Sequence, residues 1–332
     1  MQVLNAMTAA TRAIDARIGW NRIVFAISIL IIALAAGTLL RLLHDIDPGH
    51  VVAALRATAP RQIILAGVLV AAGYVTLTFY DYFALRTIGQ RHVPYRIAAL
   101  ASFTSYTIGH NLGATVFTGG AVRLRIYSAW GLGIADVAKI AFVTGLTFWL
   151  GNACVLGVSM AAAPDAASAL NQLPPWLNRA IALAGLAAIV GYLLWLLPRP
   201  RLVGSGIWKI ELPSAGLTLV QIGIGVADLS IGALAMSVLL PGVPAVGFAT
   251  VLVTYVLATL LGFVSHAPGS LGVFDAAVLV GLPQFDKSEL LATLVIFRML
   301  YFILPFVLAL LVLGSRELWL SLSNGCEPPS PT

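Results

Sequence analysis

Long apolar segments recur from one end of this sequence to the other, and they restrict its fold more than any other feature. Most of them approach or exceed the roughly 20 residues that a membrane-spanning helix needs. Only 10% of the 332 residues are charged, whereas 60% are hydrophobic. A soluble protein typically has about 25% charged residues. The sequence therefore predicts an all-α fold, that of a polytopic helical membrane protein.

The apolar segments predict six full membrane spans within a single transmembrane domain, residues 23–314. Residues 1–22 are expected to form a cytoplasmic segment. The polar, proline-rich residues 315–332 are expected to form a disordered tail. The predicted spans are residues 23–43, 63–80, 140–163, 180–197, 212–240 and 290–313.

Two further apolar elements, residues 97–122 and 243–282, are interrupted by glycine, proline and polar residues. The first contains the sequence GHNLG at residues 109–113, and the second contains SHAPGS at residues 265–270. Backbone that is neither helix nor closed sheet is tolerated at membrane depth only where it is buried in protein or lines a wet cavity. The two interruptions therefore predict a polar site inside the protein.

The basic residues indicate how the interrupted elements lie in the membrane. If both elements turn back as re-entrant hairpins and the N-terminus is cytoplasmic, most Lys and Arg residues fall on the cytoplasmic side, as the positive-inside rule requires. If both cross instead, the basic residues divide almost evenly. We favour the re-entrant arrangement, which makes residues 23–163 and 180–313 inverted repeats with both termini cytoplasmic. Inverted repeats with broken elements in matching positions are typical of transporters whose site lies near the midplane.

The first interrupted element carries most of the candidate substrate-binding residues. Their polar groups would be costly to bury without partners, so we expect them to line a cavity. They are His110, Asn111, Thr115, Thr118, Gly119 and Gly120, followed by Arg123 and Arg125. In this interpretation Arg123, with the amides of a helix that begins near Gly120, donates hydrogen bonds to a headgroup phosphate. Alternatively, the glycines serve only close helix packing, and the arginines only anchoring at the cytoplasmic surface beside Tyr127.

The second interrupted element repeats this pattern, because its sequence HAPG echoes HNLG in the first. Its candidate binding residues are His266, Gly269 and Ser270. Ionisable residues at membrane depth are costly and usually have a partner or a function. Asp275 and Arg298 are expected to form a pair, either structural or involved in gating. Asp228 has no obvious partner and is expected either to bind a proton or cation or to be held by hydrogen bonds.

Several functions are excluded by what the sequence lacks. The net charge of +6 comes from basic residues dispersed among short loops, which argues against nucleic-acid binding. Two histidines without a third ligand do not make a metal site, and Cys154 and Cys326 give no framework for disulfides or metal. No HExxH, GxSxG or Walker pattern occurs, so we expect no cofactor and no ATP site.

The segments SYTIGHNLGATVFTGGAVRLRIYSAWGL (residues 105–132) and SHAPGSLGVFDAAVL (residues 265–279) resemble blocks of the lysylphosphatidylglycerol synthase transmembrane-region family. That family includes the flippase domain of the multiple peptide resistance factor and the YbhN-like and HpnL-like proteins. The similarity extends over about residues 23–313 and includes Asp81 and the Arg298, Tyr301, Pro305 pattern. Two positions depart from the family's second block, because Ser270 replaces a glycine and Asp275 replaces a glutamate.

The resemblance implies a role in moving lipids, such as aminoacylated phosphatidylglycerol, between membrane leaflets. The matching positions are His110, Asn111, Arg123, Arg125, His266 and Arg298. No counterpart of the soluble aminoacyl transferase domain is recognised, so we expect no transfer-RNA-dependent lysyltransferase activity.

We therefore expect a flippase of the bacterial inner membrane whose partner is a membrane lipid with a polar headgroup. Further partners would be a second copy of the chain or a protein of lipid biosynthesis. Two alternatives remain at this point. One is a membrane enzyme that modifies lipids with His110 or His266 as general base. The other is a non-catalytic subunit that supports lipid, hopanoid or glycan assembly.

Overall fold

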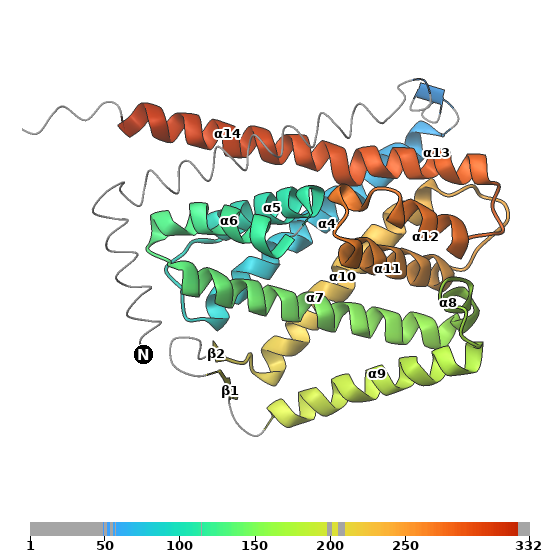
Figure 1. Cartoon of the computed structure of the whole chain (residues 1–332), viewed down its shortest axis with the longest axis horizontal. Helices are drawn as coiled ribbons and strands as arrows, with labels where there is room; N and C mark the ends of the chain where they lie inside the picture. Colours follow the sequence, from blue (N-terminus) through green and yellow to red (C-terminus); the bar gives the residue numbers. More distant parts are fainter. Residues whose placement is uncertain are drawn as a thin grey trace, which may run out of the picture.

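The chain forms a bundle of long helices with two shorter helical hairpins packed inside it (Figure 1). The computed structural model describes residues 49, 52–53, 56, 58–113, 115–197, 201–204 and 210–324, and the description below concerns these residues. The predicted segments 1–22 and 23–43 lie outside them.

The helices follow one another with short connections. The 3₁₀ turns are η1 (Ser128–Trp130) and η3 (Pro268–Ser270), the π-helical turn is η4 (Met299–Ile303), and the strands β1 (Leu202–Val203) and β2 (Ile210–Glu211) pair antiparallel. The α-helices are α4 (Pro60–Thr87), α5 (Tyr95–Leu112), α6 (Thr115–Tyr127), α7 (Ile134–Ala162), α8 (Pro164–Asn171), α9 (Pro175–Leu196), α10 (Ala215–Leu239), α11 (Phe248–Ser265), α12 (Val273–Gly281), α13 (Lys287–Arg298) and α14 (Leu304–Asn324).

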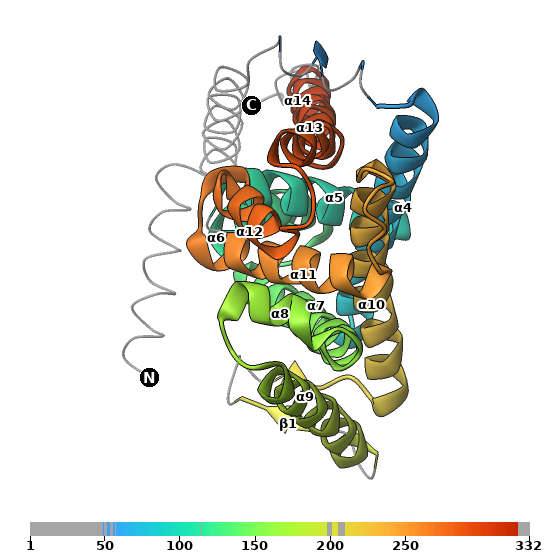
Figure 2. The same ribbon diagram turned by 90° about the vertical axis from the view of Figure 1, so that its right-hand side faces the viewer.

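Within the described residues, six helices are long and apolar enough to cross a membrane: α4, α7, α9, α10, α11 and the continuous helix from α13 into α14. Five of them correspond to predicted spans. The sixth, α11, belongs to the second interrupted element. Figure 2 shows α9 at the edge of the bundle opposite α13 and α14.

Helices α4, α7 and α10 pack closely at the centre of the bundle. Gly225 of α10 faces Gly151 of α7, where a Cβ on Gly225 would lie 2.8 Å from the Gly151 Cα. Small residues allow this approach, and backbone contact of this kind drives helix association in membranes. The crossing brings the polar middle of α10 close to the interior cavity described below.

Both predicted interruptions are confirmed as breaks between helices. Gly113 ends α5 with φ 78°, a left-handed conformation that suits glycine. Pro268 and Gly269 lie in η3 between α11 and α12. In Figure 1 the α5–α6 hairpin lies to the left and the α11–α12 hairpin to the right. Their turns face each other between them. The turns are in contact, because a Cβ on Gly113 would lie 2.5 Å from the His266 carbonyl oxygen.

The last long helix widens into a π-helical turn, η4, immediately before Pro305. Proline has no N–H to donate to the carbonyl four residues earlier, which is that of Tyr301. Tyr74 on α4 supplies a donor instead, and its hydroxyl lies 2.9 Å from the Tyr301 oxygen. The widened turn is therefore explained by the proline and stabilised by a neighbouring helix.

The predicted disordered tail is wrong over residues 315–324, because α14 continues to Asn324. The composition of this segment is polar, but Glu317 is buried and accepts hydrogen bonds from Arg125 and Arg316. An ion pair with α6 therefore holds the segment against the bundle. The rest of the predicted tail, residues 325–332, lies outside the described residues.

Candidate functional site

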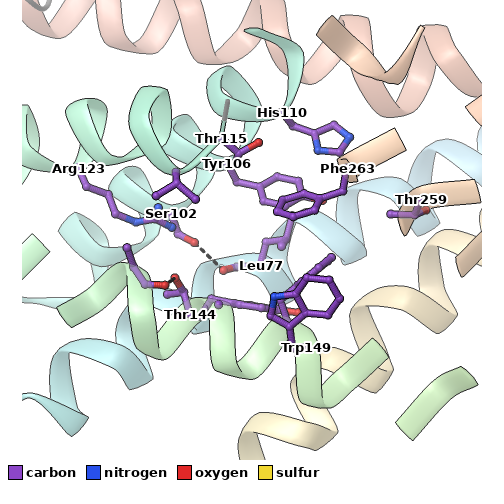
Figure 3. Close-up of a pocket in the computed structure, with 15 residues that line it drawn as sticks. Leu77, Ser102, Tyr106, His110, Thr115, Arg123, Thr144, Trp149, Thr259 and Phe263 are labelled. Atoms are coloured by element: carbon purple, nitrogen blue, oxygen red, sulfur yellow. Dashed lines mark hydrogen bonds between the residues drawn. The ribbon is translucent and has the colours of Figure 1, made fainter. Parts of the chain in front are cut away.

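A cavity of about 170 Å³, with a largely apolar wall that carries several polar groups, lies between the first hairpin and helices α4, α7 and α11 (Figure 3). Apolar side chains such as Leu77, Phe148 and Phe263 form much of its wall. Its polar lining is mostly hydroxyl groups, with one histidine, one arginine and one tryptophan. These lining residues are Tyr80, Ser102, Tyr106, His110, Thr115, Arg123, Thr144, Trp149 and Thr259.

The hydroxyls in the lining are held mainly by backbone carbonyls. Ser102 Oγ donates to the Leu77 oxygen at 2.7 Å, which Figure 3 marks. Thr144 and Thr259 donate to carbonyls of their own helices, at 3.1 Å and 2.8 Å. A hydroxyl that has given its proton away still offers lone pairs. The cavity therefore presents hydrogen-bond acceptors to whatever occupies it.

Arg123 borders the cavity, but its charge is balanced. Its Nε and Nη2 donate to the Asp81 carboxylate at 2.8 to 3.1 Å, and Tyr127 Oη donates to the same carboxylate at 2.8 Å. Asp81 is completely buried inside α4, which continues past the predicted end of the second span. Asp81 engages two of the three guanidinium nitrogens and leaves Nη1. The expected free cation for a phosphate is therefore replaced by a neutral pair with one remaining donor.

Three other candidates of the first hairpin do not line the cavity. Arg125 forms an ion pair with Glu317 of α14. Gly119 lies against the Ser105 carbonyl, where a Cβ would come within 2.9 Å, and thus serves close packing of α5 on α6. A Cβ on Gly120 would meet nothing within 4 Å. Helix α6 begins at Thr115, so the expected helix N-terminus near Gly120 is wrong.

The remaining candidates of this hairpin bond within it. Asn111 is buried and its amide donates to the Thr107 carbonyl at 2.9 Å. Thr118 donates to the Gly113 carbonyl at 3.1 Å, which fastens the turn. Neither residue is part of the cavity lining.

The two hairpin turns share a second, small cavity of about 10 Å³, enough for about one water molecule. His110, Thr115 and Phe263 line both cavities, so the small cavity adjoins the larger one. His266 and Ser270 of the second hairpin line it from the other side. The His110 ring stacks on Tyr106, with ring centroids 5.5 Å apart. The structure thus brings the two histidines together at one cavity.

Arg298 and Asp275 are brought together as expected, yet they line neither cavity. Arg298 Nη2 donates to the Asp275 carboxylate at 2.5 Å, and Nη1 donates to the Gly269 carbonyl at 3.1 Å. Asp275 also accepts from the Gly272 amide at the start of α12. The shorter aspartate therefore reaches its partner. The arrangement holds the second hairpin turn against α13.

Asp228 has a partner that the sequence did not reveal. Tyr80 Oη, from α4, lies 3.2 Å from Asp228 Oδ2, and Tyr80 itself lines the large cavity. A single hydrogen bond therefore links the Asp228 carboxylate to a residue that lines the large cavity.

Most of the lining comes from residues that were not among the candidates. Ser102, Tyr106 and His110 recur at every fourth position of α5 and so form one stripe, a helical signal that the sequence contains. Thr144 and Trp149 lie in a predicted span, and Thr259 lies in the second interrupted element. None belongs to a motif, and only the packing of the helices brings them to the cavity. Among the described residues no group of three His, Cys, Asp or Glu side chains could hold a metal ion.

These features define a class: an α-helical integral membrane protein with a cavity lined by its first broken helical element and by helices α4, α7 and α11. The chain is 30% identical over 296 residues to the uncharacterized protein slr0712 of Synechocystis, covering 88% of this chain and 91% of that protein. It is 28% identical over 263 residues to the inner membrane protein YbhN of Escherichia coli, covering 76% and 79%. The chain therefore belongs to the lysylphosphatidylglycerol synthase transmembrane-region family, together with YbhN.

A shorter match joins the chain to a larger protein. The phosphatidylglycerol lysyltransferase of Staphylococcus epidermidis is 40% identical over 74 residues, which are 22% of this chain and 9% of that protein. No family model matches the chain.

Proposed function

We propose that this protein moves a lipid with a polar headgroup between the two leaflets of the membrane, the headgroup passing through the large cavity. The observation that carries the proposal is a cavity whose wall contains hydroxyl groups and one arginine and whose rim is apolar and exposed on the bundle surface. Trp149 and Val116 line the cavity, yet they are 50% and 65% exposed on the surface of the bundle. A headgroup could occupy the cavity while its acyl chains stay in the bilayer.

The lining suits such a cargo chemically. A headgroup cannot cross hydrocarbon without donors and acceptors along its way. The hydroxyls of Ser102, Thr144 and Thr259 offer acceptors, and Arg123 Nη1 offers a donor. The name of the matched staphylococcal protein, phosphatidylglycerol lysyltransferase, further supports a lipid as the substrate. In this proposal the chain changes the location of the lipid and not its chemistry.

We propose in addition that both broken elements are re-entrant and that the two halves of the chain are inverted repeats with cytoplasmic termini. Helices α6 and α12 have 13 and 9 residues. At about 1.5 Å per residue each is well short of a hydrocarbon core of about 30 Å. The facing turns in Figure 1 support hairpins that enter from opposite sides.

Reconstitution into liposomes tests the proposed transport. Vesicles would contain fluorescently labelled phosphatidylethanolamine or phosphatidylglycerol, and a membrane-impermeant quencher would report the outer-leaflet fraction over time. We expect exchange between leaflets to be faster than in protein-free vesicles. Equal rates for every headgroup tried would refute the proposal, and a chemically altered labelled lipid on chromatography would favour the enzyme alternative.

A pair of glycine variants links that transport to the cavity. Gly145 lines the cavity, and a Cβ there would meet nothing within 4 Å, so Gly145→Leu should place its side chain in the cavity. Gly191→Leu is the matched control, because Gly191 also has open space but lies on the exposed face of α9. We expect slowed exchange for Gly145→Leu and normal exchange for Gly191→Leu.

A further inference from the structure

Asp228 is a buried acidic residue near the middle of α10, with 6% of its surface exposed. Carboxyl groups at this depth usually pair with a cation or take part in ion or proton movement. Two basic residues of the described chain that lie in its interior have other partners, because Arg123 binds Asp81 and Arg298 binds Asp275. Within the described residues, Asp228 thus has a hydrogen bond from Tyr80 but no balancing positive charge.

The groups that surround Asp228 are tyrosines from four packed elements. Tyr74 and Tyr80 come from α4, Tyr106 from α5, Tyr255 from α11 and Tyr301 from η4, and all lie close enough to interact electrostatically with Asp228. No lysine, arginine or histidine of the described chain is among these interacting groups. The environment is polar enough to hold a proton and offers no fixed counter-charge to the ionised acid.

Tyr80 connects this acid to the cavity. Its hydroxyl donates to Asp228 Oδ2 at 3.2 Å, and Tyr80 is among the residues that line the cavity. A hydroxyl is both donor and acceptor, so Tyr80 can pass its own proton to Asp228 Oδ2 while its oxygen accepts another from a hydronium ion in the cavity. One O–H bond forms on the carboxyl, one is lost from hydronium, and Tyr80 is unchanged.

We propose that Asp228 is a proton-binding site that communicates with the cavity through Tyr80, and that lipid movement is coupled to its protonation. The coupling rests on the proposed transport function; the proton site does not. A headgroup in the cavity competes for the Tyr80 hydroxyl and thereby changes the hydrogen bond that holds the ionised acid. The ligand assigned to this site is a proton, and the driving force is a proton gradient.

The proton site is tested without any transport assay. Dicyclohexylcarbodiimide reacts with protonated carboxyl groups in apolar surroundings, and mass spectrometry locates the adduct in the purified full-length protein. We expect labelling of Asp228 that decreases as pH rises and a changed pH dependence in Tyr80→Phe. Asp165→Asn, at an exposed position of α8, is the control that should leave the labelling unchanged. Labelling of Asp228 that is absent or independent of pH would overturn the proposal, as would protection by sodium ions at constant pH.

The coupling is tested in proteoliposomes containing fluorescent phosphatidylethanolamine and an imposed pH gradient. We expect the gradient to change the leaflet distribution of the lipid for wild type and for Asp228→Glu, but not for Asp228→Asn. Transport that ignores the gradient and tolerates Asp228→Asn would refute coupling and leave the transport function standing. No transport in any variant, together with pH-dependent labelling, would refute the transport function and the coupling while retaining the proton site.

Discussion

At the residue scale, the buried ion pair of Asp81 and Arg123 is the interaction that most affects both stability and charge at the site. Asp81 is entirely buried and accepts hydrogen bonds from both Arg123 and Tyr127. A buried pair often contributes little net stability compared with apolar residues, but removing one partner leaves an uncompensated charge. Replacing either residue alone should therefore lower the stability of the protein far more than replacing both together.

We expect Arg123→Ala to lower the free energy of unfolding by about 3 to 5 kcal/mol, because Asp81 is left charged and buried. Unfolding in mixed detergent micelles measures the change. The double variant Asp81→Asn with Arg123→Gln should recover most of the loss, since neither side chain is then charged. Arg96→Ala is the control at an exposed position. Equal losses for the single and double variants would contradict this account.

The sequence identified several residues of the site but not their partners. His110, His266 and Arg123 stand out as polar residues in apolar segments, and this alone predicted their proximity to a cavity. The pairing of Arg123 with Asp81 joins residues on different helices and depends on how α4 and α6 each pack against α5 and α7. The sequence did not identify Tyr80 as the partner of Asp228, because a tyrosine near the end of an apolar segment is typical of the membrane interface.

At the element scale, the contact between α7 and α10 positions the cavity walls. Thr144 and Trp149 of α7 line the cavity, and the backbone of α7 contacts α10 at Gly151 and Gly225. Any side chain at that crossing would push the two helices apart. The helix that forms part of the cavity wall is thus held in place by its contact with α10.

Gly225→Ala should destabilise the protein by about 1 to 3 kcal/mol, the usual cost of overpacking a tight contact. Gly223→Ala is the matched control on the same helix, because its Cβ would meet nothing within 4 Å; replacing glycine there should change stability by about 1 kcal/mol or less, in the favourable direction. Thermal unfolding in detergent compares them. A loss in Gly223→Ala as large as that in Gly225→Ala would argue against the tight crossing.

Element positions were largely predictable, whereas element ends were not. Glycine and proline at 113 and 268 marked both helix breaks, because these residues disfavour a continuing helix. The end of α14 was missed because polar composition was interpreted as disorder, although an ion pair to Arg125 secures it. Helix ends depend on such long-range partners, which local sequence patterns do not contain.

At the scale of the whole molecule, the proposed re-entrant hairpins determine which loops share a side of the membrane. Gln90, before α5, and Ser128, after α6, should face the same side. Val243, before α11, and Gln284, after α12, should face the opposite side. Single cysteines at these positions, introduced after replacement of Cys154 and Cys326, can be tested with an impermeant thiol reagent in intact cells and in inverted vesicles. Labelling of Gln90→Cys and Ser128→Cys from opposite sides would show that the first element crosses.

The balance of charge in the cavity predicts its preference among headgroups. Arg123 is the one lysine or arginine in the described lining, and Asp81 neutralises it. Because the hydroxyl oxygens are acceptors, we expect labelled phosphatidylethanolamine, whose ammonium donates hydrogen bonds, to exchange faster than labelled phosphatidylglycerol in the same vesicles. Asp81→Asn should reduce this preference by exposing the arginine charge. The opposite order of rates in the wild type would contradict the assignment of an acceptor-rich site.

The helix that runs from α13 through η4 into α14 connects the two hairpins mechanically. Arg298, at the end of α13, is bonded to the second hairpin, and Glu317, in α14, is bonded to the first. At about 1.5 Å per residue these anchors are about 28 Å apart, close to the thickness of the hydrocarbon core. The π-helical turn at Met299–Ile303 lies between the anchors. A displacement of one hairpin relative to the other would therefore be expected to strain this helix, whose widened turn lies between the two anchors, or one of the two ion pairs.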